Sequence, residues 1–245
     1  MTYTPFYLHG ETRPGRWLVT CDHASNTVPP DIGGGDLGLP REDMERHIAY
    51  DVGAYGMSQH LGVLLDSQVI ASNFSRLVID PNRGEDDPTL LMKLYDGSVI
   101  PANRHADAAE RERRLDMCYR PYHEQLARLA GLPHCVVLSV HSYTRQLRGR
   151  DPRPWHVGVL HTDDTRLSDP LLARLRAESD LVVGDNEPYG GHLPGDAIDQ
   201  HASQHGRPNV LIEVRNDLIA DHAGQRAWAE RLAPILTAAL ADAGI

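Results

Sequence analysis

Two histidines stand at the ends of apolar runs that have the character of buried strands. His23 closes the run WLVTCDH and His141 closes the run CVVLSVH, while a third run, VLIEV, carries Glu213 inside it. In open α/β sheets the ligand crevice lies at the carboxyl ends of the strands, so these three side chains are expected to converge there. Imidazole and carboxylate groups around a metal ion and a water indicate hydrolysis.

Asp51 is the candidate third ligand of such a metal. It lies four residues after His47 in a predicted helix, which places both side chains on one helix face and directs them into the same cleft. An ordinary pair on a helix surface is the competing interpretation. Two imidazoles and one carboxylate, with a fourth position open, match the ligand set of catalytic zinc sites.

Glu213 needs a partner, because burying an unpaired carboxylate is costly or drives it to its neutral form. Two roles are open for it. It is either the general base beside a metal-activated water or one half of a buried ion pair with Arg215 or another arginine.

The segment FSRLVIDPNR gathers two arginines, an aspartate and an asparagine around one short predicted strand. The guanidinium fork of Arg76 or Arg83 can bind a carboxylate through two hydrogen bonds, and Asn82 can add an amide donor. A structural role, in which Arg76 orients Asp80 or Asp51, competes with this interpretation.

The elements that must position these residues alternate between short apolar runs and longer helical patterns. Strands are predicted at Trp17–Cys21, Ser67–Ala71, Leu77–Asp80, Cys135–His141, His156–Leu160, Leu181–Val183 and Asn209–Val214. Helices are predicted at Arg41–Leu64, Ala106–Ala130, Thr165–Glu178 and Asp217–Ala241, with Pro234 kinking or splitting the last. This alternation predicts an α/β fold in which a mostly parallel or mixed central sheet is covered by helices.

Two stretches rich in glycine and proline, Val28–Pro40 and Asn186–Gln200, are predicted to be loops near a pocket. Neither resembles a linker, so residues 1–245 are expected to form a single domain. The first contains three consecutive glycines but lacks the spacing of a phosphate-binding loop.

The composition narrows the class of protein. The 245 residues carry 24 basic and 34 acidic side chains, a net charge of −10, which argues against binding a nucleic-acid backbone. The amino terminus lacks the features of a signal peptide and no apolar run is long enough to cross a membrane, so a cytoplasmic location and no membrane partner are expected. The three cysteines are expected to be reduced. The sequence gives no indication of the oligomeric state.

Motifs spread over most of the chain resemble those of the N-formylglutamate amidohydrolase family. They are CDHASN followed by PP, HIAYDVGA, SRLVIDPNR, VHSYT, PWHVG, NEPY and LIEVRNDL. The resemblance implies a single-domain, three-layer α/β/α architecture of hydrolase type, similar to that of zinc peptidases. It also implies a deacylase that acts on the amide of an N-formyl or N-acyl amino acid, such as N-formylglutamate.

The resemblance assigns roles to the site residues. His23 and His141 become ligands of one Zn²⁺ ion, or of another divalent metal, and Glu213 becomes the general base. Asn82 and Arg83 receive the substrate carboxylate. In the mechanism that we expect from these roles, the metal and Arg76 steady the developing oxyanion, and Tyr189 or His201 closes over the substrate or assists the leaving amine.

The middle ligand departs from the pattern of the carboxypeptidase relatives, which carry a glutamate three residues after the first histidine. Here that residue is Asn26, a weaker metal ligand. Asp51 is therefore the expected third ligand, and Asn26 either coordinates weakly or orients a ligand or the substrate.

Other functions stay open at the level of sequence. A non-catalytic protein that binds a metal or a carboxylate, and a carboxypeptidase-like hydrolase of another small amide, would use the same residues. A metal-free hydrolase with Cys21 or Ser142 as nucleophile is disfavoured, because no glycine-flanked nucleophile elbow is present.

Overall fold

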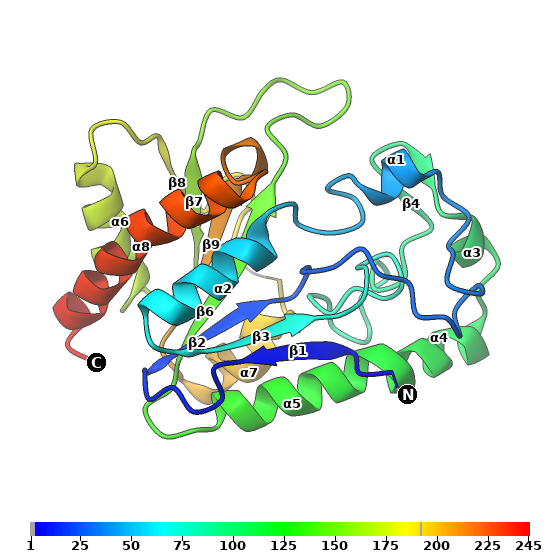
Figure 1. The fold of residues 1–245 in the computed structure, drawn as a ribbon, viewed down its shortest axis with the longest axis horizontal. Coiled ribbons are helices and arrows are strands. Elements are labelled where there is room, and N and C mark those ends of the chain that lie inside the picture. Colours follow the sequence, from blue (N-terminus) through cyan, green and yellow to red (C-terminus); the bar gives the residue numbers. More distant parts are fainter. Residues whose placement is uncertain (1–2, 192) are drawn as a thin grey trace.

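The computed structural model describes residues 3–191 and 193–245, which form a mixed α/β structure around a seven-stranded sheet (Figure 1). The strands are β1 Phe6–His9, β2 Trp17–Cys21, β3 Gln68–Ser72, β6 Val136–Tyr143, β7 Val157–Leu160, β8 Val183–Asp185 and β9 Asn209–Arg215. Their order across the sheet is β1-β3-β2-β6-β9-β7-β8. The central strands β3, β2, β6 and β9 are parallel, whereas β1 and β7 each run antiparallel to their inner neighbour. The predicted mixed α/β fold is confirmed.

Helices cover both faces of the sheet. One face packs against α2 Ala54–Leu64, α6 Ser168–Ala177 and α8 His222–Ala243, and the other against the continuous run α4 Ala108–Arg114, η1 Leu115–Tyr119 and α5 Arg120–Ala130. Successive strand residues point to opposite faces, so Val19 belongs to the first core and Leu18 to the second. Figure 1 shows α2 beside α8 on one side and α5 along the other.

The remaining elements are short. They are α1 Arg41–Met44, α3 Pro101–Arg104, α7 Ala197–His201, the 3₁₀ turns η2 Ser203–His205 and η3 Asn216–Leu218, and a hairpin of β4 Leu94–Tyr95 and β5 Ser98–Val99. Most of the predicted strands and helices are present with small shifts at their ends. The helix α7 forms inside the stretch that was predicted to be a loop.

The long helix predicted over Arg41–Leu64 is wrong in its middle. Residues 45–53 form turns, and Gly53 adopts a left-handed φ of 82° immediately before α2. A Cβ at Gly53 would approach the carbonyl oxygen of Ile219 to 2.0 Å, so only glycine fits there. His47 and Asp51 therefore do not share a helix face, and His47 lies instead 3.4 Å from the carboxylate of Asp96.

Two further predictions need correction. The run Leu77–Asp80 forms a turn rather than a strand, because the backbone N–H of Val78 donates to the carbonyl of Ser75 and the Ser75 hydroxyl accepts from Leu77. Its apolar residues are buried all the same, which explains why they resemble a strand. Pro234 does not split α8, since Ala233 and Leu236 beside it pack into the core and offset the lost backbone hydrogen bond.

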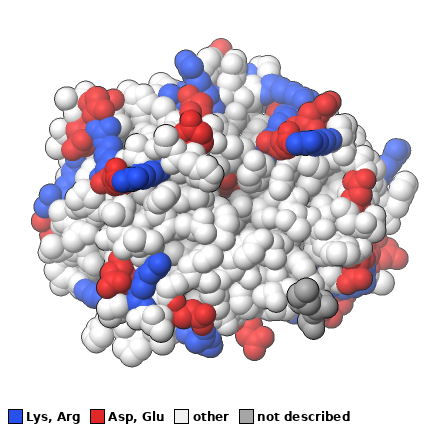
Figure 2. Space-filling view, viewed as in Figure 1, with Lys and Arg blue, Asp and Glu red and all other residues white. Residues whose placement is uncertain are grey.

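The surface carries mixed charge on the face drawn in Figure 2, where basic side chains lie beside acidic ones rather than in one patch. The three cysteines are free thiols, as expected. Among the described residues, no helix is long and apolar enough to cross a membrane.

The fold brings the predicted site residues to one edge of the sheet. The parallel strands β2, β6 and β9 end side by side, and the register pairs His141 with Glu213. His23 follows the end of β2 by two residues. The expected convergence at the carboxyl ends of these strands is therefore present.

Candidate metal centre and active site

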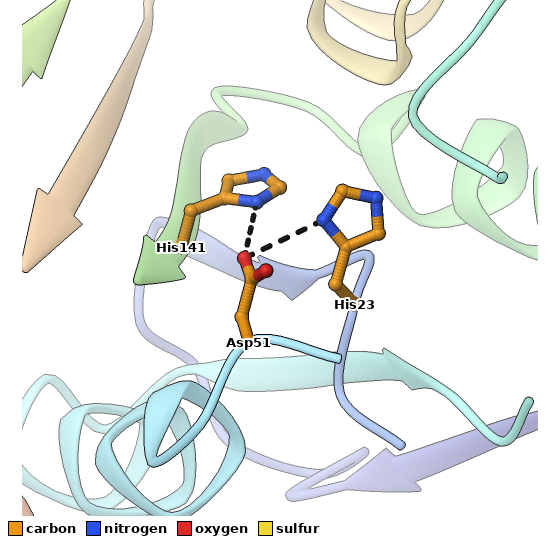
Figure 3. Close-up of side chains that lie close together, drawn as sticks. All are labelled: His23, Asp51 and His141. Carbon is orange, nitrogen blue, oxygen red and sulfur yellow. Dashed lines mark hydrogen bonds and ion pairs between the residues drawn. The ribbon is translucent and has the colours of Figure 1, made fainter. Parts of the chain in front are cut away.

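His23, Asp51 and His141 form a buried cluster whose side chains point toward one another (Figure 3). Oδ2 of Asp51 lies 2.8 Å from Nδ1 of His141 and 3.4 Å from Nδ1 of His23. One ligand atom from each residue can be chosen so that all three lie within 4.8 Å of one another. Two imidazole nitrogens and a carboxylate oxygen at this spacing are a donor set for one divalent metal ion.

A buried ring nitrogen supports this interpretation. Nδ1 of His23 is buried and makes no hydrogen bond within residues 3–191 and 193–245, although Oδ2 of Asp51 lies 3.4 Å away. Buried polar atoms in native proteins are almost always hydrogen-bonded, so an imidazole nitrogen that faces two other donors without such a bond fits a metal ligand. The residues present therefore fit a bound divalent cation.

Backbone hydrogen bonds fix the carboxylate of this cluster although it lies outside regular structure. The N–H of Asp51 donates to the carbonyl of His23 at 2.9 Å, which ties the loop before α2 to the end of β2. The N–H of Ser142 donates to Oδ2 of Asp51 at 3.2 Å. Asp51 is thus held against both histidines by strand ends rather than by a helix.

Two more aspartates hold the outer nitrogens of the histidine rings. Nε2 of His23 lies 2.7 Å from Oδ1 of Asp80, and Nε2 of His141 lies 3.4 Å from Oδ2 of Asp22. Such carboxylate–histidine pairs orient the ring and leave the other nitrogen for the metal. The Tyr122 hydroxyl donates to Asp22 and fixes its orientation in turn.

These outer aspartates are ionised in the folded protein. Burial opposes the charge of Asp80, but the neighbouring Arg76 guanidinium and His23 hold its pKa well below the usual range. Burial also opposes the charge of Asp22, whose pKa is lowered by its hydrogen bond with His141. Sequence reasoning did not consider Asp22 and treated Asp80 only as a partner of Arg76. The one available indication was that Asp22 directly precedes His23 and that Asp80 lies two residues before Asn82.

Arg76 links the cluster of His23, Asp51 and His141 to Asp80, one of the two outer aspartates. Its Nε and one terminal nitrogen donate to Oδ2 of Asp80 at 3.1 and 2.8 Å, and its other terminal nitrogen lies 3.6 Å from Oδ1 of Asp51. The guanidinium lies over the ring of Tyr95 at 5.4 Å. Arg76 therefore orients both aspartates, as one of the sequence interpretations held.

A cavity of about 290 Å³ opens beside the cluster. Its lining includes His23, Asp51, Arg76, Asn82, Arg83, His141, Tyr189 and Glu213. Most of the predicted site residues are thus brought to one cavity, which is large enough for a small amino-acid derivative.

Glu213 faces this cavity without a partner. Its Oε2 is buried and unpaired within the described part of the chain, and burial raises the pKa of its carboxyl to about 8. The negative charge of Asp51 raises this pKa further, whereas His141 and Arg76 oppose the shift. Arg215, the candidate ion-pair partner, binds Asp217 at 2.7 Å instead. Gly158 on β7 lies opposite Glu213 in the sheet register. A Cβ at Gly158 would come within 1.9 Å of the Glu187 carbonyl oxygen.

The structure does not bring Asn26 and His201 to the cavity lining. The Asn26 amide donates to the carbonyl of Met44 at 2.9 Å. His201 is buried on α7, where its Nε2 lies 2.7 Å from Nδ1 of His123. Sequence reasoning had placed His123 among the unremarkable histidines, but it is buried, and its Nε2 lies 3.0 Å from the carbonyl oxygen of Pro81.

The alternative nucleophiles are poorly placed. Cys21 is fully buried, and burial raises the pKa of its thiol well above the usual value, which keeps it protonated. The Ser142 hydroxyl donates to the carbonyl of Val52 at 2.8 Å rather than to an imidazole. Among residues 3–191 and 193–245, neither side chain is hydrogen-bonded to a base that could activate it.

Comparison with known proteins agrees with the motifs. Residues 15–220 match the model of the N-formylglutamate amidohydrolase family. An N-formylglutamate deformylase of Pseudomonas aeruginosa is 29% identical over 212 residues, which cover 76% of this chain and 74% of that protein.

Solved structures show the same similarity. The crystal structure of a gene product from Agrobacterium tumefaciens has a TM-score of 0.90 and 33% identity, over 99% of this chain and 97% of the other. That of N-formylglutamate amidohydrolase from Ralstonia eutropha JMP134 shares the fold at a TM-score of 0.68 and 21% identity, over 98% and 97% of the two chains. On the extent of the match to the family model, the chain belongs to the N-formylglutamate amidohydrolase family.

Proposed function

We propose that this protein is a metal-dependent amidohydrolase that cleaves the N-formyl or N-acyl amide of an amino acid such as N-formylglutamate. The observation that carries the proposal is the unpaired carboxyl of Glu213, which faces the same cavity as the His23, Asp51 and His141 cluster. A buried acid without a partner beside three candidate metal ligands fits a general base. Membership of the family and the similarity to a deformylase support the same activity.

The cofactor we propose is one Zn²⁺ ion held by Nδ1 of His23, Nδ1 of His141 and a carboxylate oxygen of Asp51. When bound, a divalent ion supplies Lewis acidity, which polarises the amide carbonyl and makes a water a better nucleophile. Asp22 and Asp80 hold the two rings in place for this purpose through their contacts with the outer nitrogens.

In the proposed reaction Glu213 transfers the proton of the attacking water, and Arg76 stabilises the negative charge that develops on the carbonyl oxygen. In its ionised form, which the positive charge of a bound divalent ion would favour, Glu213 takes a proton from the attacking water and passes it to the nitrogen of the departing amine. Arg76 lines the cavity and is held rigidly by Asp80, so its positive charge lies fixed beside the carbonyl oxygen as negative charge develops there.

Asn82 and Arg83 are the proposed contacts of the substrate carboxylate. Both line the cavity, and the Asn82 side chain is anchored because its Oδ1 accepts a hydrogen bond from the N–H of Ala197 at 3.2 Å. Arg83 hydrogen-bonds to the Thr89 hydroxyl and to the carbonyl of Asn82, which are neutral groups, so its charge stays available for an anion. Tyr189 is 42% exposed on the cavity lining and is proposed to cover the bound substrate.

The Glu213→Gln variant tests the enzyme against a binding protein that holds a metal without turnover. The amide keeps the shape of the side chain but cannot accept the proton. We expect near-stoichiometric zinc in both proteins, and a loss of formate release from N-formylglutamate of about 10²-fold or more in the variant. Glu230→Gln, on the exposed side of α8, is the matched control and should retain full activity. Unchanged turnover in Glu213→Gln would contradict the proposal, and zinc without turnover in the unaltered protein would favour the binding function.

A further inference from the structure

Three leucines line part of the cavity beside the cluster of His23, Asp51 and His141. Leu160 on β7 and Leu211 on β9 are directly opposed in the antiparallel register, and both line the cavity. Leu211 precedes Glu213 by two residues and therefore points to the same face of the sheet, about 7 Å along the strand. Leu193 adds a third apolar side chain to the lining and is 44% exposed. We call Leu160, Leu193 and Leu211 the leucine wall.

The leucine wall lies next to the proposed carboxylate contacts. Ile198 on α7 packs with Leu160 and Leu211 in one apolar cluster. The residue before it, Ala197, donates its N–H to the Asn82 side chain. A group that touches the wall is therefore close to the end of the substrate that carries the carboxylate. In an N-acyl amino acid that group is the side chain, because it shares its carbon with the carboxylate.

The cavity offers little positive charge for a second carboxylate. Within the described lining the guanidiniums are those of Arg76 and Arg83, and Arg76 is already engaged by two aspartates. The carboxyls of Asp51, Asp196 and Glu213 line the same space. A dicarboxylate would place its second charge beside acids and leucines, and the described lining holds no further guanidinium to offset the desolvation cost.

Arg153 lies nearby but is engaged outside the cavity lining. Its guanidinium donates to the carbonyl of Thr144 and to the hydroxyl of Tyr189, and it lies over the rings of Tyr143 and Tyr189 at 4.8 and 5.5 Å. These contacts use most of its donors. Arg153 therefore braces Tyr189 rather than supplying a free fork to the substrate.

We infer that the preferred substrates are N-acyl amino acids with a single carboxylate and an apolar side chain, which packs against the leucine wall. This inference rests on the proposed function, since it assigns a side chain to the substrate of the same site. Arg83 and Asn82 bind the one carboxylate, and the amide lies between the metal cluster and Glu213. The leucine wall then selects the side chain by removing it from water.

The test compares kcat/KM of the zinc-loaded protein for N-formyl-L-leucine and N-formyl-L-glutamate, with formate release as the readout. We expect leucine to be preferred by at least about tenfold, the effect of burying part of one aliphatic side chain. Equal rates, or a preference for glutamate, would overturn the inference and leave the proposed function intact. Absence of turnover with both compounds would overturn the two together.

Variants separate the leucine wall from a general effect on activity. Leu160→Asn should reduce the ratio of kcat/KM for N-formyl-L-leucine to that for N-formyl-L-glutamate about fivefold or more. Leu193→Asn tests the same wall at an exposed position, where folding is not at risk. Leu132→Asn, an exposed leucine that lies off the cavity lining, is the control and should leave the ratio as it was. A ratio unchanged in both wall variants would refute the assignment.

Discussion

The buried pair of His123 and His201 should make the protein sensitive to acid, and His201→Gln should remove about half of that sensitivity. Nδ1 of His123 on α5 and Nε2 of His201 on α7 lie 2.7 Å apart, and both side chains are buried. Glutamine has nearly the reach of imidazole and keeps a group that can hydrogen-bond to His123, but it does not titrate. The variant therefore changes protonation with little change in packing.

The direction and size of the pH effect on stability follow from the lowered pKa values of the two histidines. Burial lowers the pKa of His123 to about 3 and that of His201 to about 4, against about 6.5 in the unfolded chain. Because both pKa values are lowered in the folded protein, the unfolded state binds more protons than the folded state does. The stability that the neutral histidines contribute is fully present above about pH 6.5. It is lost as the pH falls toward the pKa values of the folded protein. At about pH 5, which is about 1.5 units below the unfolded pKa, each ring lowers the unfolding free energy by about 2 kcal/mol.

The assay is urea denaturation of the original protein and of His201→Gln near pH 7.5 and near pH 5, with a chelator present so that metal release does not contribute. We expect the unfolding free energy of the original protein to fall by about 2 kcal/mol more than that of the variant. His105→Gln changes an exposed histidine in the same way and should leave the fall unchanged. An equal fall in the original protein and in His201→Gln would refute the linkage.

Three further predictions concern the proposed site. Asp80→Asn should weaken zinc binding by about 10- to 100-fold, because His23 loses the carboxylate that holds its ring, and competition with a chromogenic chelator measures this. Arg83→Ala should raise KM for an N-formyl amino acid more than tenfold but leave that for the corresponding α-amide nearly unchanged, since only the acid uses the guanidinium. Removal of metal by a chelator should abolish hydrolysis, and added zinc should restore it; activity that persists in metal-free protein would contradict the metal dependence.

The convergence of His23, His141 and Glu213 could be predicted from the sequence because parallel strands end at a common edge. Two apolar runs end at the histidines, and a third carries Glu213 near its end. That argument needs only strand direction and the alternation of side chains. The position of Asp51 was predicted for the wrong reason. It lies in a turn, not on a helix, and a backbone hydrogen bond to His23 brings it to the site.

Other parts of the site depend on contacts that local patterns do not encode. Asp22 reaches Tyr122, a hundred residues later, through a contact that exists only once α5 packs on the sheet. His123 and His201 meet in the same way across α5 and α7. Strand β1 was missed because it is a partly buried edge strand without the apolar run that marks the central ones.

The charges around His23, Asp51 and His141 indicate how many divalent ions the proposed site would hold. Asp22, Asp51 and Asp80 are buried and have lowered pKa values, so all three are ionised. The buried guanidinium of Arg76 balances one of them. The two charges that remain equal the charge of one divalent ion bound by neutral imidazoles, and burial of uncompensated charge would otherwise be costly. One divalent ion at the proposed site would therefore balance the aspartates and leave the carboxyl of Glu213 available for the proposed proton transfer.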